Sequence, residues 1–390
     1  MIRSALAYTR YMAVALVDPA ARALVFAHRN GVGEEVLDRK VALRKAISYL
    51  LLAQRNGSDD GMGSYHLVHG WGASYPETTG YAIPTMIAAA DLLQWHEARE
   101  AAVKAGEWLL SIQHADGGWQ GGRVGEGRPS IVFNTAQVIR GMLAVHAITG
   151  EERFREAAMR AGRWIISVQD ADGAWRGANF MGTARVYDTY VDAPLLQLSA
   201  QTEDTALRTS VLRNLEWVLA QQQTNGWFAN ADNTIRHNDR PITHTIAYTL
   251  DGLLECARIL GDDRFAQAAT QAAGALADRY LSTGRLHGRY DSAWSGSEHP
   301  LMTGCAQMTI VWTRLAAATK EGRFAEAATR MLAFLGAVQR LGEVGPVDAR
   351  GALSGSFPLW GRYEKFAFPN WGTKYFADAL LCAEGHPPAF

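Results

Sequence analysis

The stretch SVQDADGAW, residues 167–175, occurs three times in the chain with small changes. The other copies are SIQHADGGW at residues 111–119 and AQQQTNGWF at residues 220–228. Each copy follows a segment in which apolar residues recur three and four positions apart, which is the spacing of an amphipathic helix. The Asp-Gly or Asn-Gly pair supplies a glycine for the left-handed conformation that ends helices. The stretch therefore predicts a helix terminator that closes a structural repeat.

A second kind of segment lies between these terminators and carries threonine beside small and polar residues at its start. Each of six such segments continues into a long apolar run, which predicts a helix buried on most sides. The six segments start near Glu77, Asn134, Asp188, His244, Thr303 and Asn370. Charged segments such as RFREAAMRAGRWII predict exposed helices between them. Six inner helices that alternate with six outer helices predict a closed ring of helical hairpins.

The repeat also resembles a known superfamily. The segments KAGEWLLSIQHADGGW and RAGRWIISVQDADGAW resemble the Gln-to-Trp repeat of the squalene-cyclase and prenyltransferase superfamily. That resemblance implies the toroid fold that six-hairpin glycosidases, polysaccharide lyases and uronyl epimerases also have. The segments SYPETTGYAIPT, RPITHTIAYT and FPNWGTKYF resemble uncharacterised bacterial proteins associated with polysaccharide biosynthesis. We therefore expect an all-α (α/α)6 toroid in one domain over residues 41–390, after a helical N-terminal extension over residues 1–40.

Composition narrows the classes of partner and ligand. The 38 basic and 39 acidic residues nearly balance and are scattered, which argues against nucleic acid or an anionic membrane as a partner. The opening segment MIRSALAYTRYMAVALVDPAARALVF has no sustained apolar core of the signal-peptide or membrane-span type. The three cysteines are too far apart for a disulfide framework or a zinc pattern. We expect a cytoplasmic protein without a metal ion or cofactor, and the sequence leaves its oligomeric state open.

The starts of the inner helices are the expected place for chemistry. Inner helices that run parallel present their amino ends at one rim, together with unpaired backbone N–H groups and the positive ends of the helix dipoles. Asn134 and Thr189 fit a simple capping role there. Glu77, Tyr248 and Lys374 are poor caps, so their presence at this rim favours a functional site.

Two mechanisms fit the polar residues at this rim. Glycoside hydrolysis needs one protonated and one ionised carboxyl group, which Glu77 could provide with Asp188 or Asp192. In the competing interpretation Asp188 caps its helix, and Asp192 forms an ion pair with a residue such as Arg185. Hydrolysis is the first mechanism that the sequence predicts.

The second mechanism begins with proton abstraction beside the carboxyl group of a uronic acid. His244, Tyr248 or Tyr81 could act as the base, which would make the protein a polysaccharide lyase or a uronyl C5-epimerase. Arg240 and Lys374 could anchor the acidic sugar. Tyr248 could instead be a core aromatic residue whose hydroxyl group finds a backbone partner.

Aromatic residues in the loops and polar residues at the helix starts complete the predicted site, since aromatic faces stack on sugar rings. The predicted substrate contacts are His69, Trp71, Tyr81, Asn134, Arg240, Asp291, Trp294, Trp360, Asn370, Trp371, Lys374 and Tyr375. The loop tryptophans could equally be buried anchors. The sequence thus predicts a carbohydrate-active enzyme of exopolysaccharide metabolism that cleaves or remodels a glycan containing uronic acid.

Two other classes of function stay open. A non-catalytic glycan-binding assembly factor would keep the loop aromatics as ligand contacts and leave the carboxylates as ordinary caps. A terpenoid cyclase-like protein would need an acidic cluster and a greasy cavity, and the nearest approach to such a cluster is YDTYVD at residues 187–192.

Overall fold

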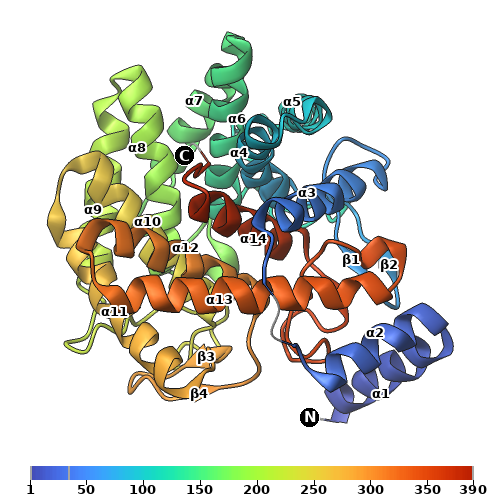
Figure 1. Ribbon diagram of the computed structural model, residues 1–390. Helices are drawn as coiled ribbons and strands as arrows, with labels where there is room; N and C mark the ends of the chain where they lie inside the picture. Colours follow the sequence, from blue (N-terminus) through green and yellow to red (C-terminus); the bar gives the residue numbers. More distant parts are fainter. Residues whose placement is uncertain (1, 34–35, 389–390) are drawn as a thin grey trace.

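Six inner helices form a closed ring in the computed structural model, which describes residues 2–33 and 36–388 (Figure 1). The inner helices are α4 (Pro76–Leu93), α6 (Val132–Thr149), α8 (Thr189–Thr202), α10 (Thr243–Leu260), α12 (Met302–Thr319) and α14 (Asn370–Ala383). Each packs against the next, and α14 packs against α4. This arrangement confirms the ring that the repeat predicts.

Six outer helices surround this ring, each paired with an inner helix. They are α3 (Arg39–Arg55), α5 (His96–Ser111), α7 (Glu152–Ser167), α9 (Thr205–Leu219), α11 (Asp263–Thr283) and α13 (Gly322–Leu341). Five of them pair with the inner helix just before them in the chain, whereas α3 pairs with α14 at the other end of the sequence. The architecture is the predicted (α/α)6 toroid.

Glycines allow the inner helices to approach one another closely. A Cβ atom on Gly80 of α4 would lie 2.7 Å from Cα of Val138 on α6. A Cβ atom on Gly252 of α10 would lie 2.5 Å from the backbone of Thr189 on α8. Because a side chain at either position would force the backbones apart, the narrow ring depends on these glycines.

The repeated terminator joins neighbouring outer helices through its glutamine. The side-chain amide of Gln113 donates to the carbonyl oxygens of Gly117 (2.8 Å) and Ala157 (3.0 Å), the second of which lies on α7. Gln169 repeats the pattern with Gly173 (2.8 Å) and with Ser210 on α9 (2.9 Å). The glutamine thus closes its own turn and holds the next hairpin beside it.

The glycine of the terminator behaves as the sequence predicts, and the tryptophan secures the same turn. Gly117 and Gly173 have φ angles of +96° and +93°, in the left-handed region that favours glycine. The indole nitrogen of Trp175 donates to the carbonyl oxygen of Ile165 (3.0 Å), so the aromatic residue folds back on the helix that precedes it. Trp119 makes the same contact with Leu109 (2.8 Å).

Replacing Gln169 with leucine should destabilise the protein by about 1–3 kcal/mol, because the hydrogen bonds that its side chain donates to Gly173 and Ser210 and accepts from the hydroxyl group of Ser210 would be lost. The free energy of unfolding can be measured by urea titration. Gln201→Leu is the control, since Gln201 is exposed at the end of α8 and its replacement should change stability by less than about 0.5 kcal/mol. Equal effects of the two substitutions would contradict the role assigned to Gln169.

Short strands lie at the rim where the inner helices begin. Strands β1 (Tyr65–His66), β2 (Gly70–Trp71) and β5 (Ala367–Phe368) form an antiparallel sheet between the loops that precede α4 and α14. Strands β3 (Arg289–Tyr290) and β4 (Gly296–Ser297) pair in the loop before α12. These strands fix loops whose ends carry side chains into the site.

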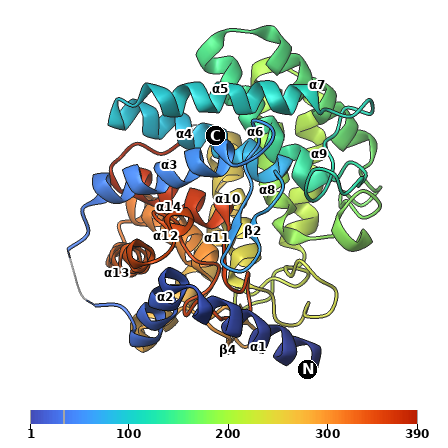
Figure 2. The same ribbon diagram turned by 90° about the vertical axis from the view of Figure 1, so that its right-hand side faces the viewer.

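The helices α1 (Ile2–Val17) and α2 (Pro19–Asn30) form a hairpin at the edge of the ring (Figures 1 and 2). Tyr11 packs edge-on against His66, with ring centroids 5.1 Å apart, so the hairpin contacts the sheet at the rim. The domain boundary near residue 40 stays a prediction. In the part of the chain that the structure describes, no helix is long and apolar enough to span a membrane.

Candidate active site

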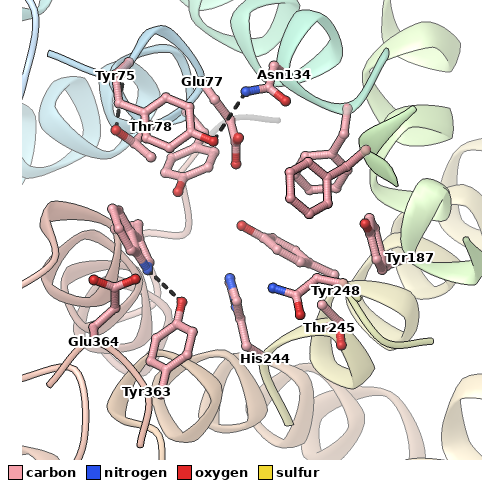
Figure 3. Close-up of a pocket in the computed structure, with 15 residues that line it drawn as sticks. Tyr75, Glu77, Thr78, Asn134, Tyr187, His244, Thr245, Tyr248, Tyr363 and Glu364 are labelled. Carbon is pink, nitrogen blue, oxygen red and sulfur yellow. Dashed lines mark hydrogen bonds between the residues drawn. The ribbon is translucent and has the colours of Figure 1, made fainter. Parts of the chain in front are cut away.

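A cavity of about 230 Å³ opens at the rim where the inner helices begin (Figure 3). Its wall includes Glu77 at the start of α4, Asn134 at the start of α6 and His244 at the start of α10. Trp371 at the start of α14 and Tyr363 in the preceding loop complete one side. The shared rim therefore brings together residues that lie far apart in the sequence.

Glu77 is a half-buried carboxyl group in the first turn of α4, directly after Pro76. Burial raises its pKa to about 7, and a hydrogen bond with Tyr75 partly opposes this shift. Asn134 in turn donates to the hydroxyl oxygen of Tyr75 (3.4 Å). Glu77 is thus held in place and is mostly protonated below about pH 7, which is the state that a general acid needs.

His244 points into the cavity from the side opposite Glu77, and the Tyr248 hydroxyl lies between them in the view of Figure 3. Its Nδ1 lies 2.7 Å from Oε1 of Gln307 on α12. Because an amide oxygen only accepts hydrogen bonds, Nδ1 carries the proton and Nε2 keeps its lone pair. Burial lowers the pKa of His244 to about 4, so the imidazole is neutral at physiological pH and can accept a proton from a ligand.

Tyrosine rings form the floor of the cavity. Tyr81 and Tyr248 line it, and Tyr190 and Tyr375 pack beneath them, with ring centroids of Tyr190 and Tyr248 4.6 Å apart. Burial raises the pKa of Tyr81 and of Tyr248 well above the usual value, so both keep their protons. They are suited to hydrogen bonding with a ligand, and neither is poised as a base.

The predicted contacts Lys374 and Tyr375 lie below this floor, outside the cavity lining. The ammonium group of Lys374 lies 4.0 Å from the ring centroid of Tyr375 and 2.7 Å from a carboxylate oxygen of Asp378. Thr85 donates to the other oxygen of Asp378 (2.6 Å). All of these side chains are buried. The geometry gives Lys374 a structural part beneath the tyrosines.

Asp188 and Asp192 are fully buried and do not line the cavity. Asp188 accepts a hydrogen bond from Asn179 (2.7 Å), and burial raises the pKa of both carboxyl groups well above the usual value. The competing interpretation pairs Asp192 with Arg185, but among the described residues both carboxylate oxygens of Asp192 lack a hydrogen-bond partner, and the charge of Arg185 acts on Asp188 instead. The structure therefore does not bring the predicted carboxyl pair together in the cavity. Tyr187 occupies the corresponding wall instead.

Several predicted sugar contacts in the loops are structural anchors. The indole nitrogen of Trp71 donates to Asp348 (2.9 Å), and that of Trp294 donates to the carbonyl oxygen of Asn225 (3.1 Å). The interpretation of the loop tryptophans as buried anchors fits Trp294, whereas Trp71 is only partly buried. Trp371 differs, since it lines the cavity and donates to the hydroxyl oxygen of Tyr363 (2.9 Å).

The remaining predicted contacts also lie outside the cavity lining. Asn370 donates to the carbonyl oxygens of Met62 and Gly63 and so ties α14 to the sheet. His69 contacts Tyr11 of the N-terminal hairpin. Asp291 accepts from backbone nitrogens within its own turn, Arg240 pairs with the neighbouring Asp239, and Trp360 packs partly buried against the core.

Sequence reasoning missed Glu364, which lines the cavity from the loop before α14. Its φ angle is +43°, a left-handed conformation that is uncommon for residues other than glycine and often marks functional sites. Burial raises its pKa, and Arg123 opposes the shift. Sequence reasoning also passed over Phe133 and Asn233 as lining residues. Only the density of aromatic residues in these loops could have indicated them.

Comparison with known proteins adds information about the fold. No protein-family model and no curated protein matches the sequence. An unsaturated glucuronyl hydrolase specific for heparin superposes with a TM-score of 0.70 at 13% identity, over 89% of this chain and 97% of that one. The cellobiose 2-epimerase of Bacillus thermoamylovorans B4167 gives 0.68 at 12% identity, over 87% and 96%. The chain shares their fold.

A polysaccharide lyase is similar as well, with a TM-score of 0.65 at 11% identity over 89% of this chain and 96% of that one. The three structures are (α/α)6 toroids, as the resemblance of the repeat implies. Their names describe hydrolysis, epimerisation and elimination. The toroid therefore does not select a reaction, which has to be argued from the residues of the cavity.

Proposed function

We propose that the protein is a carbohydrate-active enzyme that hydrolyses a glycosidic bond at the end of an oligosaccharide or polysaccharide. The observation that carries this proposal is the pair formed by Glu77, a carboxyl group with its pKa raised to about 7, and His244, a neutral imidazole on the opposite side of one cavity. The names of the similar structures, which include a glucuronyl hydrolase, support the choice of a glycan as substrate.

The two residues divide the proton transfers of hydrolysis between them. Glu77 gives its proton to the glycosidic oxygen as the bond from that oxygen to the anomeric carbon breaks. A water molecule attacks the anomeric carbon, and Nε2 of His244 accepts the proton that the water loses. The proton then returns from His244 to Glu77 through solvent, which restores both groups. Glu77 keeps the part of the acid that the sequence predicts, and His244 replaces the predicted aspartate as the base.

The size of the cavity favours the end of a chain over its middle. Its volume of about 230 Å³ is below the roughly 300–1,000 Å³ of pockets that hold drug-sized ligands. The tyrosines close its floor, which leaves no path for a polymer to pass through. One sugar ring in the cavity, with the rest of the glycan outside the rim, fits these dimensions.

Proton transfer at carbon is the second candidate, and the unprotonated Nε2 of His244 is the observation that favours it. A neutral base that faces a protonated carboxyl group could remove and return a proton at a sugar carbon. Such an enzyme would be an epimerase or, if a leaving group departs, a lyase. The catalytic base would then be His244, since Tyr248 retains its own proton.

Mass spectrometry of reactions run in H₂¹⁸O and in D₂O separates these reactions. Hydrolysis incorporates one ¹⁸O atom into the product, and this is the expected result. An unsaturated product that absorbs in the ultraviolet would indicate a lyase. Deuterium at carbon with unchanged chain length would indicate an epimerase. A panel of glycans that yields no product of any kind would contradict the enzymatic proposal and favour a glycan-binding assembly factor.

The pH dependence of kcat/KM should be bell-shaped, with limbs near pH 4 and pH 7. Activity falls below about pH 4 because His244 becomes protonated, and falls above about pH 7 because Glu77 loses its proton. Initial rates between pH 3.5 and pH 9 measure the profile. A flat profile through pH 7 would contradict the assignment of Glu77 as the acid.

The other predicted functions find less support in the cavity. A terpenoid cyclase-like protein needs an apolar interior, whereas Glu77, Asn134 and His244 give this wall strong polar groups. The link to exopolysaccharide metabolism, the cytoplasmic location and the absence of a nucleic-acid partner stay predictions from the sequence.

A further inference from the structure

The cavity lining contains more acidic than basic side chains. Its lining contains two carboxyl groups, Glu77 and Glu364, and within the described residues it contains neither lysine nor arginine. Its other polar groups are uncharged, and they include Asn134, Asn233 and Thr78. These amides and hydroxyl groups can bond sugar hydroxyl groups, but none of them carries a positive charge.

Two buried or half-buried basic residues near the cavity, Lys374 and Arg289, form ion pairs elsewhere, and Arg123, whose charge opposes the raised pKa of Glu364, lies outside the lining. Lys374 lies below the floor, paired with Asp378. Arg289, in the loop before α12, lies 3.1 Å from Asp232 and also contacts Glu298. These ion pairs place the positive charge in the scaffold around the cavity, outside its lining.

Aromatic side chains form much of the cavity wall. Trp371, Phe133 and Tyr187 surround the space between Glu77 and His244. Faces of this kind stack on the C–H groups of a pyranose ring, and this contact requires no charge. The walls thus offer stacking and neutral hydrogen bonds, the two contacts that an uncharged sugar uses.

From these observations we infer that the sugar ring bound in the cavity is an uncharged pyranose, without a carboxylate at C6. A uronate in this position would leave water without gaining a cation, and above about pH 7, where Glu77 is ionised, it would also place its charge near a second carboxylate. This inference rests on the proposed function and narrows its substrate class. It sets the protein apart from the glucuronyl hydrolases that share its fold, and it disfavours elimination or C5-epimerisation of a uronic acid.

The test compares ligands that differ only at C6. Binding of methyl glucoside and methyl glucuronide, and of methyl galactoside and methyl galacturonide, is measured by calorimetry on the full-length protein at pH 8, for both anomers. The neutral member of at least one pair should bind about tenfold or more tightly than its uronate. Equal or tighter binding of the uronates would overturn the inference while leaving hydrolysis intact.

A substitution in the cavity wall tests the same electrostatic argument. Asn233→Arg adds a guanidinium group at the cavity wall. It should lower the ratio of the affinity for the neutral ligand to the affinity for its uronate. Asn56→Arg is the control, because Asn56 lies exposed at the end of α3 and should leave the ratio unchanged. An unchanged ratio in Asn233→Arg would count against the electrostatic argument. Binding by neither member of any pair, together with no hydrolysis of any glycan, would overturn the proposed function itself.

Discussion

Replacing Glu77 with glutamine should lower kcat/KM by about 10²- to 10⁴-fold, because the amide cannot give a proton to the leaving oxygen. The substrate should still bind, since glutamine keeps the size of the side chain and its hydrogen-bonding capacity. Kinetics with a substrate identified by the product assay measure the loss. The alkaline limb of the pH profile near pH 7 should disappear with the carboxyl group, and this readout would not change if Glu77 were only structural.

Glu100→Gln is the matched control, because Glu100 is an exposed residue of α5. Stability provides a second check. The pKa of Glu77 is raised on folding, so its favourable contribution is complete below pH 4.5 and is lost as the pH rises towards 7 and above. The glutamine variant should lack this pH dependence. Retention of activity within a few-fold of the parent protein would remove Glu77 from the mechanism.

Replacing Lys374 with methionine should destabilise the protein by about 3–5 kcal/mol, because Asp378 would lose its cation in a buried position beneath the tyrosine floor. The free energy of unfolding, measured with urea at pH 7, gives the loss. The double variant Lys374→Met with Asp378→Leu should recover most of the stability, because neither charge then remains buried.

The surface supplies a control of the same chemical type. Arg330 and Glu326 form an ion pair on α13 with about half of each side chain exposed, so Arg330→Met should cost about 0–1 kcal/mol. If Lys374→Met costs no more than Arg330→Met, then the buried pair does not hold the floor in place.

The ring could be predicted because its repeat marks the end of each helix. Gly173 has the left-handed conformation and Trp175 makes the contact with the preceding helix that the stretch suggests, whereas the bond from Gln169 to the next hairpin was found only in the structure. The alternation of charged and apolar helices then separates the outer ring from the inner one. These signals are local, and for this reason they survive in a single sequence.

The site could be predicted only in part. Glu77, Tyr81, Asn134, His244, Tyr248 and Trp371 were expected and line the cavity. Asp188 and Asp192 were expected there too. They are four positions apart, so both lie on the same face at the start of α8. In the structure this face is buried against neighbouring helices and does not face the cavity. Glu364 itself has a left-handed backbone conformation, and no residue type in its loop indicates that conformation.

Closure of the ring by α3 and α14 has a consequence for folding. Arg39 at the start of α3 donates to the carbonyl oxygen of Ala383 at the end of α14 (3.1 Å), across 344 positions of sequence. Contacts of such long range form late and slowly. The hairpins from α4–α5 to α12–α13 can form from segments that are close in sequence, yet the cavity is complete only when α14 packs against α3 and α4. The cavity should therefore form in a late folding step, together with the closed ring.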